Sequence, residues 1–576
     1  MKLTISGSKN SESLYIQKSY KNNQGKSSTT TVRKLGKLTE LCETLGTDRD
    51  GVIAWAKEQV RIETEKYKAE KETNNVVITF KANEQMEYNQ KKFFLGGYLF
   101  PQSIYYDLKL DYICKRIKSK HKFEYDLNAI LSDLIYTRIL EPNSKRSSFK
   151  TAQNLLERPS YSLYDVYRSL SVLADECDFI QSEVYKNSLL TTKRSNKILY
   201  YDCTNYYFEI EQEDGDKRYG KSKEHRPNPI IQMGMFTDGD GIPLAFSLFP
   251  GNQNEQKSLK PLEQTVIRDF GCHKFIYCSD AGLGSESIRE FNNIGERSFI
   301  VTQSIKKLKK EEKEWALDNR GFRRLSDGKE IEDISKIDPE DKDVYYKEDP
   351  YTPKRIHQNL IVTYSPKYAM YQKTIREKQI ERANKMLAEG KHKRTRKNPN
   401  DPARFISQIA VTNQGEVADK KVYTLDEEKI AEESRYDGLY ALCTDLLDDD
   451  PKTIINVSEG RWQIEACFRN LKTDFQARPV YVRTEQSVTS HFLVCFLALL
   501  IYKLLEKKLN KKYTCDEILD TLKAINFADI QEQGYMPLYE RNRITDDLHD
   551  ICGFRTDFNF ITKQKMRTIQ KNSKRH

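Results

Sequence analysis

The sequence lacks the closely spaced cysteines that hold zinc in small structural sites. Its 11 cysteines are scattered, none forms a C-x-x-C pair, and the eight histidines do not cluster near them. A zinc site is therefore not expected. Reduced thiols in a cytosolic protein are the simpler interpretation.

Long apolar segments are also missing. The first residues, MKLTISGSKN, contain no apolar stretch of signal-peptide length, and the longest apolar run is 492–502. That run is shorter than the roughly 20 residues that cross a bilayer as a helix. We therefore expect a cytoplasmic protein and a buried helix at 492–505. No internal repeat is evident.

Charge is plentiful but uneven. Of the 576 residues, 31 % are charged and the formal net charge is +10. Lys and Arg gather in the run 391–397 (KHKRTRK) and in the tail 561–576, neither of which contains an acid. Such runs suit a polyanion partner, although a charge run is more often a solvated face.

The pattern of apolar residues changes along the chain. Residues 1–35 alternate apolar and polar residues, as in a β-hairpin, residues 36–75 are predicted to be helical, and 86–195 are mostly helical. From residue 197 the pattern predicts the order β-β-β-α-β-α-β. The predicted elements are strands at 197–203, 230–236 and 244–249, a helix at 255–270, a strand at 274–279, a helix at 286–293 and a strand at 299–302. A polar interruption, 306–454, follows.

Two acids are predicted to end apolar strands, and a third lies on a helix. Asp202 follows KILYY and Asp280 follows KFIYCS, and sites of α/β sheets form at the carboxyl ends of strands. Residues 460–475 (GRWQIEACFRNLKTDF) are predicted to form one amphipathic helix. On it Arg461, Glu465 and Lys472 share one stripe, because they are four and seven residues apart.

Three converging carboxylates repel one another unless a cation neutralises them. Asp202, Asp280 and Glu465 would suit two Mg²⁺ (or Mn²⁺) ions, which prefer oxygen ligands and promote phosphodiester chemistry. Arg461 and Lys472 would then meet DNA phosphates. Each acid alone is weak evidence, since strand-end acids are commonly turn residues and such helix stripes are commonly solvated.

A basic stretch, GKSKEHRPNP at 220–229, lies between the first two strands of this pattern. Its cations Lys221, Lys223 and Arg226 are predicted to line a DNA path near Asp202. The alternative is an exposed basic loop without a partner.

The combined motifs resemble bacterial insertion-sequence transposases of the DDE type. The spacing R-x3-E-x6-K of Arg461, Glu465 and Lys472 is similar to the Y-R-E-K signature of the insertion sequence four superfamily, and the chain most resembles its sixteen-thirty-four branch. Ser458 stands where that signature has Tyr, a departure that removes a ring contact but leaves a hydroxyl for a phosphate. Further similar stretches are YYDCTNYYFE, FPGN, CSDAGL and RPVYVR.

The resemblance implies an α/β ribonuclease-H-like core, a mixed sheet flanked by helices, interrupted by a large insertion. It also implies that the element moves by cut-and-paste, with DNA cleavage and strand transfer at its terminal inverted repeats. In this reaction Asp202, Asp280 and Glu465 would be the catalytic residues and would bind the metal ions. The implied partners are the transposon ends, the target DNA and a second copy of the chain, since a homodimer would pair the two ends. The implied location is the bacterial cytoplasm.

The predicted organisation has six regions. They are a small β and helical N-terminal region at 1–85 and a helical domain at 86–195, both candidate DNA-binding regions, a first core segment at 196–305, an insertion domain, partly β, at 306–454, a second core segment with the Glu465 helix at 455–510, and a basic C-terminal region at 511–576. Two other functions fit the same core: a nuclease that cuts without joining, and an inactive DNA-binding relic.

Overall fold

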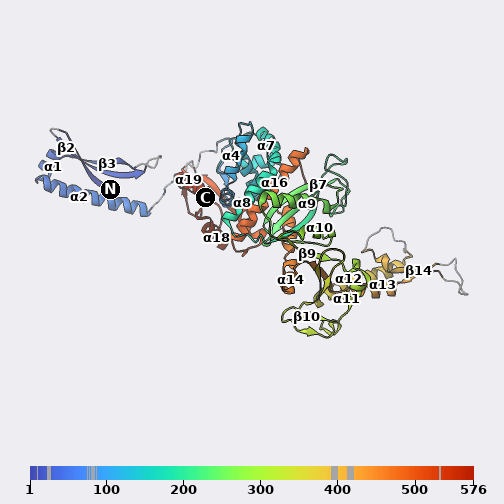
Figure 1. The fold of residues 1–576 in the computed structure, drawn as a ribbon. Helices are drawn as coiled ribbons and strands as arrows, with labels where there is room; N and C mark the ends of the chain where they lie inside the picture. Colours follow the sequence, from blue (N-terminus) through green and yellow to red (C-terminus); the bar gives the residue numbers. More distant parts are fainter. Residues whose placement is uncertain are drawn as a thin grey trace. The chain divides into compact units, whose positions relative to one another are not determined.

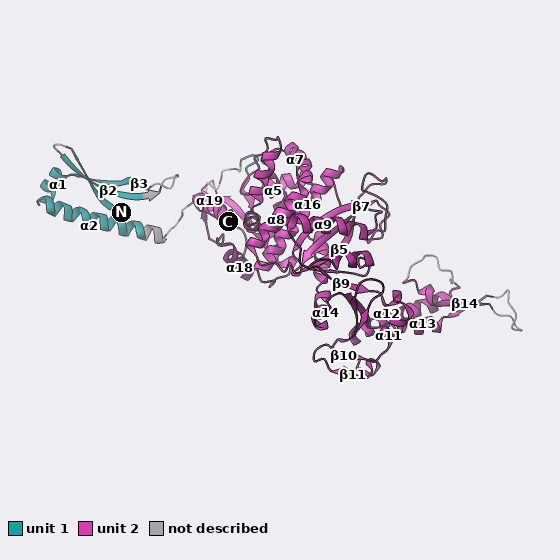
Figure 2. Cartoon of the chain, viewed as in Figure 1, with its two compact units in different colours: residues 1–90 teal, residues 91–576 magenta. Residues whose placement is uncertain are grey.

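The computed structural model describes residues 1–8, 11–21, 27–73, 76, 78–79, 83, 85, 87–390, 400–410, 421–530 and 533–575. The basic run predicted at 391–397 lies outside these described residues. The chain divides into two compact units, Met1–Gln90 and Lys91–His576, shown in separate colours in Figure 2.

The smaller unit is a three-stranded antiparallel sheet with two helices. The strand order is β1-β2-β3, so the structure adds a third strand to the hairpin expected from the sequence. The elements are β1 Lys2–Ser8, β2 Ser11–Lys21, β3 Ser27–Lys37, α1 Leu38–Leu45 and α2 Arg49–Thr73. Leu14 and Ile16 of β2 are fully buried, as are Val52 and Ala56 of α2.

The larger unit is built on a ten-stranded mixed sheet flanked by helices. Its strand order is β11-β10-β12-β13-β16-β9-β8-β5-β6-β7, in which β5, β8 and β9 are parallel and the other pairs antiparallel. The elements that follow the predicted β-β-β-α-β-α-β order are β5 Ile198–Tyr207, β6 Ile230–Asp238, β7 Pro243–Pro250, α9 Glu255–Phe270, β8 Ile276–Ser279, α10 Glu286–Asn292 and β9 Ser298–Gln303.

Both faces of this sheet are buried, which explains the apolar strands. Side chains alternate between the two faces along a strand. Tyr200 packs into the core that contains α14 Pro451–Glu459, α15 Trp462–Lys472 and α16 Glu485–Lys508, whereas Tyr201 packs into the opposite core under α9.

The apolar helix α16 lies in the middle of the first of these cores. It packs against α7, α5 and α3, and nearly all its residues from Val488 to Leu505 are buried. The helix is longer than the apolar run seen in the sequence. Within the described residues, α16 is the one helix long and apolar enough to cross a membrane, and 89 % of its most apolar window is buried inside the fold.

The interruption between β9 and α14 contributes strands to the same sheet. The outer half of the sheet, from β11 to β16, comes from this segment, so much of it continues the core sheet as well as adding the α12 region (Figure 1). Its elements are α11 Lys310–Leu317, β10 Phe322–Arg324, β11 Glu330–Ile331, β12 Tyr345–Tyr351, β13 Gln358–Tyr364, α12 Pro366–Ala388, β14 Ile406–Ala410, β15 Lys421–Leu425, α13 Glu427–Ser434 and β16 Leu439–Thr444, with short 3₁₀ turns at Ile305–Lys307, Ile334–Lys336 and Pro402–Phe405.

The helical region before the sheet and the C-terminal region pack together. Strand β4 pairs with β17, and together with β18 and β19 they form a four-stranded sheet. The elements before the sheet are β4 Phe93–Leu95, α3 Leu99–Asp107, α4 Leu110–Lys120, α5 Leu127–Leu140, α6 Lys145–Ala152, α7 Leu163–Asp175 and α8 Cys177–Thr191. Those after α16 are α17 Cys515–Ala524, β17 Asn526–Ile530, β18 Gly534–Pro537, α18 Arg543–Cys552, β19 Ile561–Thr562 and α19 Lys563–Asn572. The boundaries expected at 195 and 510 therefore fall inside one compact unit.

Candidate metal and DNA site

Asp202 lies in the middle of β5. The sequence predicted that the strand ends at this acid, which is wrong, since β5 continues to Tyr207. The apolar run stops at Asp202, but the pairing with β6 continues beyond it. Asp202 shares the face of Tyr200, two residues earlier, whose hydroxyl donates to the carbonyl of Val457 in α14 at 2.9 Å. The acid therefore faces the helices α14 and α15.

Asp280 comes directly after β8, as the sequence predicted. Strand β8 is the parallel neighbour of β5, and the register that pairs Cys278 with Tyr200 brings Asp280 level with Asp202. Burial raises the pKa of Asp202 to about 6, and the nearby charge of Asp280 raises this pKa too, against the opposing effects of Lys223 and the Cys203 N–H group. The two carboxylates, on neighbouring strands, therefore interact electrostatically.

Glu465 lies in the first turn of α15, which packs on β5. Its side chain is exposed and lines a hollow of about 220 Å³ beside Tyr440, Ser458, Arg461 and Trp462. Among the described residues Glu465 makes no hydrogen bond or ion pair, so its carboxylate is available to a ligand.

The three carboxylates are not packed tightly together. Among the described residues, one group of three potential metal ligands has its ligand atoms within 4.8 Å of one another, and that group lies elsewhere, around α18. Asp202, Asp280 and Glu465 are instead contributed by two neighbouring strands and a helix that packs on the first of them. No described Lys or Arg lies within 4 Å of their carboxylates.

Arg461 is held in place by hydroxyl groups. Its Nη1 donates to Thr302 Oγ1 at 2.7 Å and, more weakly, to Tyr440 Oη at 3.5 Å. Burial lowers the pKa of Arg461, but Tyr440 and Cys278, together with Asp280 and Asp202, raise the pKa above its ordinary value overall. A fixed cation therefore stands beside the acids without being bonded to them.

Lys472 and the 220–229 loop meet near Asp202. Lys472 pairs with Glu224 of this loop at 3.4 Å, and burial, reinforced by Lys223, lowers the pKa of Lys472 to about 8. Lys223 donates to the carbonyl of Cys203 and pairs with Glu255 at 3.7 Å. The Lys472 and Lys223 cations thus border Asp202.

The remaining predicted DNA contacts are placed differently. The Lys221 and Arg226 side chains are exposed, and Arg226 stacks over the Tyr207 ring at 4.2 Å. Ser458 is buried at the end of α14, although it lines the hollow of Glu465.

Three residues near the acids were missed by sequence reasoning. Thr302 of β9 and Tyr440 of β16 hold Arg461, and these two residues are 138 positions apart in the chain. Trp462 is 63 % exposed although it is a large apolar side chain, and it lines the same hollow as Glu465. Its spacing of three residues from Glu465 on a helix was the available signal.

Residues 198–501 match the protein-family model described as the transposase DDE domain. The chain belongs to this transposase family. The matched segment runs from β5 into α16 and contains Asp202, Asp280 and Glu465. DDE transposases generally use divalent metal ions.

No curated protein matches this transposase chain. A solved structure, the piggyBac transposase synaptic complex with hairpin DNA, is similar at 8 % identity with a TM-score of 0.37, covering 83 % of this chain and 85 % of that one. A likeness of this size assigns no residue of the present transposase.

Proposed function

We propose that this transposase mobilises an insertion sequence by binding its terminal inverted repeats, cleaving DNA at the element's ends and joining the freed 3′-hydroxyl to target DNA, by cut-and-paste. The observation that carries the proposal is the placement of three acids within the matched segment. Asp202 and Asp280 stand level on neighbouring parallel strands, and Glu465 is presented by the helix that packs on β5.

The half of the sheet that ends at β7 supports a ribonuclease-H-like core. Five consecutive strands run in the order β7-β6-β5-β8-β9, with the first three antiparallel and the last three parallel. A catalytic acid on the central strand, one after its parallel neighbour and one on a later helix is the arrangement that the Y-R-E-K resemblance implies. We propose that the chain belongs to the insertion sequence four superfamily and to its sixteen-thirty-four branch.

Asp202, Asp280 and Glu465 fit a site for two Mg²⁺ (or Mn²⁺) ions. All three offer oxygen ligands, the type that these ions prefer. The carboxylates have no described cationic partner within 4 Å, and burial, together with the charge of Asp280, raises the pKa of Asp202. When bound, such ions activate a water or hydroxyl nucleophile and stabilise the leaving oxygen of a phosphodiester.

The protein's own residues then position the DNA. Arg461, fixed by Thr302 and Tyr440, offers its remaining N–H groups to a phosphate beside the acids. Lys472 and Lys223 border Asp202, and the exposed Lys221 and Arg226 of the same loop add further cations for phosphates. Ser458 adds a hydroxyl at the wall of the Glu465 hollow.

We further propose that two copies of the chain pair two transposon ends, as a homodimer, in the bacterial cytoplasm. The pairing follows from the reaction, since two ends must be cut and joined together.

One experiment separates this function from a nuclease and from an inactive relic. The protein is incubated with Mg²⁺, a linear donor that carries the inverted repeats flanking its gene, and a supercoiled target plasmid. Joined products are expected. Cleavage without joining would identify a nuclease, and a band shift without cleavage would identify a relic.

A further inference from the structure

One face of the β1-β2-β3 sheet is covered and the other is open. Leu14 of β2 packs with Val52 and Ala56 of α2, and Ile16 of the same strand is also fully buried. Glu12 faces the same helix and pairs with its Arg49 at 3.2 Å. Figure 1 shows α2 along one side of this small sheet. In the smaller unit no described element covers the opposite face.

The residues of the open face follow from the strand alternation. Glu12, Leu14 and Ile16 point to the helices, so Tyr15 and Gln17 point away from them. The register pairs Tyr15 with Thr4 and Lys34, and pairs Gln17 with Lys2 and Thr31. Two rows of side chains therefore cross all three strands on the open face.

These two rows contain hydroxyl, amide, phenol and amine groups but no carboxylate. Lys2 on β1 and Lys34 on β3 are exposed, and neither forms an ion pair with a residue that the structure describes. The surface therefore carries uncompensated positive charge at both of its edges. It matches a polyanion better than an apolar or a cationic partner.

The amide of Gln17 is held at the centre of the face. Its Oε1 accepts a hydrogen bond from Thr4 Oγ1 at 3.0 Å, and its Nε2 donates to Thr31 Oγ1 at 3.4 Å. A glutamine amide that is fixed by both neighbouring strands has a defined donor and acceptor direction. In the major groove such an amide pairs with the N6 and N7 atoms of adenine.

We propose that the open face of the β1-β2-β3 sheet binds duplex DNA in the major groove. Gln17 contacts base edges, and Lys2 and Lys34 contact phosphates on either side. Three strands about 4.8 Å apart give a surface about 10 Å across, which fits a groove about 12 Å wide. The proposal rests on the proposed function only in taking the terminal repeat as the sequence that is read.

The first test removes the positive charge. The full-length chain with Lys2→Ala and Lys34→Ala is compared with a control carrying Lys57→Ala and Lys66→Ala, which removes equal charge from exposed positions of α2. Binding to a labelled duplex is measured by fluorescence anisotropy over a series of salt concentrations. The sheet variant should bind at least about tenfold more weakly at low salt, and its salt slope should fall by about 1 to 2, because each phosphate contact contributes about 0.9.

The second test changes the reading residue. Gln17→Ala should reduce the preference for the terminal repeat over a scrambled duplex by about 5- to 150-fold, the range of one bidentate base contact. Binding to the scrambled duplex should remain close to that of the wild type. Circular dichroism and melting curves of each variant establish that it is folded.

The outcomes separate this inference from the proposed function. If the wild type joins transposon ends and the sheet variants bind DNA like the helix control, the inference is overturned and the function stands. If the sheet variants lose binding while the wild type never cuts DNA, the inference stands and the function falls. Unchanged discrimination in Gln17→Ala would overturn the reading role of that residue.

Discussion

Two carboxylate clusters lie in the larger unit, one on the central sheet and one around α18. The sheet cluster is Asp202, Asp280 and Glu465, from elements far apart in the chain. The α18 cluster includes Asp546 and Asp557, whose ligand atoms lie with that of His549 within 4.8 Å of one another. By proximity alone, the α18 cluster is the better metal site.

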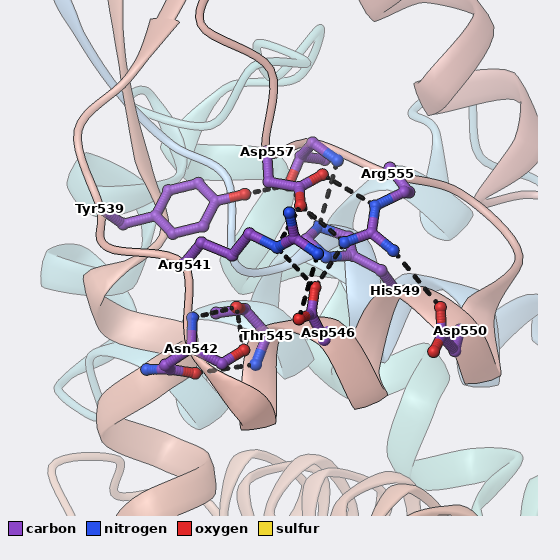
Figure 3. Close-up of polar contacts among 10 residues, drawn as sticks. Tyr539, Arg541, Asn542, Thr545, Asp546, His549, Asp550, Arg555 and Asp557 are labelled. Carbon is purple, nitrogen blue, oxygen red and sulfur yellow. Dashed lines mark hydrogen bonds and ion pairs between the residues drawn. The ribbon is translucent and has the colours of Figure 1, made fainter.

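The partners of the acids reverse that ranking. In the α18 cluster Arg555 donates to Asp546 at 2.5 Å and to Asp557 at 2.6 Å, and it also reaches Asp550 at 3.4 Å. Arg541 adds a second guanidinium, which donates to Asp546 at 2.8 Å (Figure 3). The charges of these acids are already neutralised by the protein.

His549 is also unsuited to bind a metal in this arrangement. Its Nε2 accepts a hydrogen bond from the backbone N–H of Thr556 at 3.1 Å and lies 2.9 Å from Thr556 Oγ1, so the protein already engages this nitrogen, and burial lowers the pKa of the ring. The α18 cluster is a structural ion-pair network, whereas the acids of the sheet have no described cationic partner. Whether neighbouring cations already neutralise the carboxylates therefore distinguishes a metal site from an ion-pair network better than the distance between the carboxylates does.

The largest expected difference is in catalysis. Glu465→Ala should reduce cleavage of terminal-repeat DNA by more than about a hundredfold, because outer-shell partners of metal ligands alone contribute about 10- to 100-fold. Binding of the DNA ends should be nearly intact, since Glu465 holds no DNA phosphate. Cleavage is followed on labelled donor DNA with Mg²⁺, and Asp546→Asn serves as the matched control. Cleavage by Glu465→Ala at the wild-type rate would show that the site is wrongly assigned.

A metal should stabilise one cluster and not the other. At a Mg²⁺ or Mn²⁺ concentration of about 100 times its Kd, the wild type should gain about 2.7 kcal/mol in free energy of unfolding. Asp280→Asn should lose this gain, whereas Asp546→Asn should keep it. Melting temperatures with and without the ion measure the effect. A gain that disappears in Asp546→Asn instead would place the ion at α18.

Removing an arginine should affect stability and not chemistry. Arg555→Ala should lower the free energy of unfolding by about 1–2 kcal/mol, because hydrogen bonds to charged groups contribute about 1.5–3 kcal/mol and the partly exposed Arg555 loses some of that to solvent screening. Denaturant titration gives the value. DNA cleavage should proceed as in the wild type, and a loss of cleavage in a folded Arg555→Ala protein would contradict a purely structural role.

Arg555 should also affect how the free energy of unfolding depends on pH in acid. The hydrogen bonds from Arg555 hold the pKa of Asp557 down, at about 2. A depressed carboxyl pKa adds stability above its ordinary value, near 3.8, and this stability is lost as the pH falls from there toward 2. In Arg555→Ala the free energy of unfolding should depend less steeply on pH over that window. Equal slopes in both proteins would contradict the assignment.

The smallest effect is expected at the rim of the α18 cluster. Asp550 is 71 % exposed and lies 3.4 Å from Arg555. Asp550→Asn should change the free energy of unfolding by no more than about 0.5 kcal/mol, since exposed ion pairs contribute little. A larger loss would mean that the network extends to the surface.

Much of the fold was predictable, because local patterns survive in it. The β-β-β-α-β-α-β order, the position of Asp280 after β8 and the helix of Glu465 all follow from apolar periodicity over short windows. The end of β5 was not predictable, because the strand continues past Asp202 through residues that are buried only by distant helices. The ion pair of Lys472 with Glu224 was missed for a similar reason, since the two residues lie far apart in the chain.

The amino-acid sequence by itself indicated the family: the motifs around Asp202, Asp280 and Glu465 resemble those of DDE transposases, and the match of residues 198–501 to the transposase DDE domain confirms that family. Only the tertiary structure decided that those acids have no described cationic partner within 4 Å and that Thr302 and Tyr440 hold Arg461, because strand pairing between β9 and β16 brings these two residues together. It also decided that the interruption supplies the outer half of the core sheet. Local composition selects helices and strands, whereas pairing between distant strands and burial against distant helices depend on contacts that no short window contains.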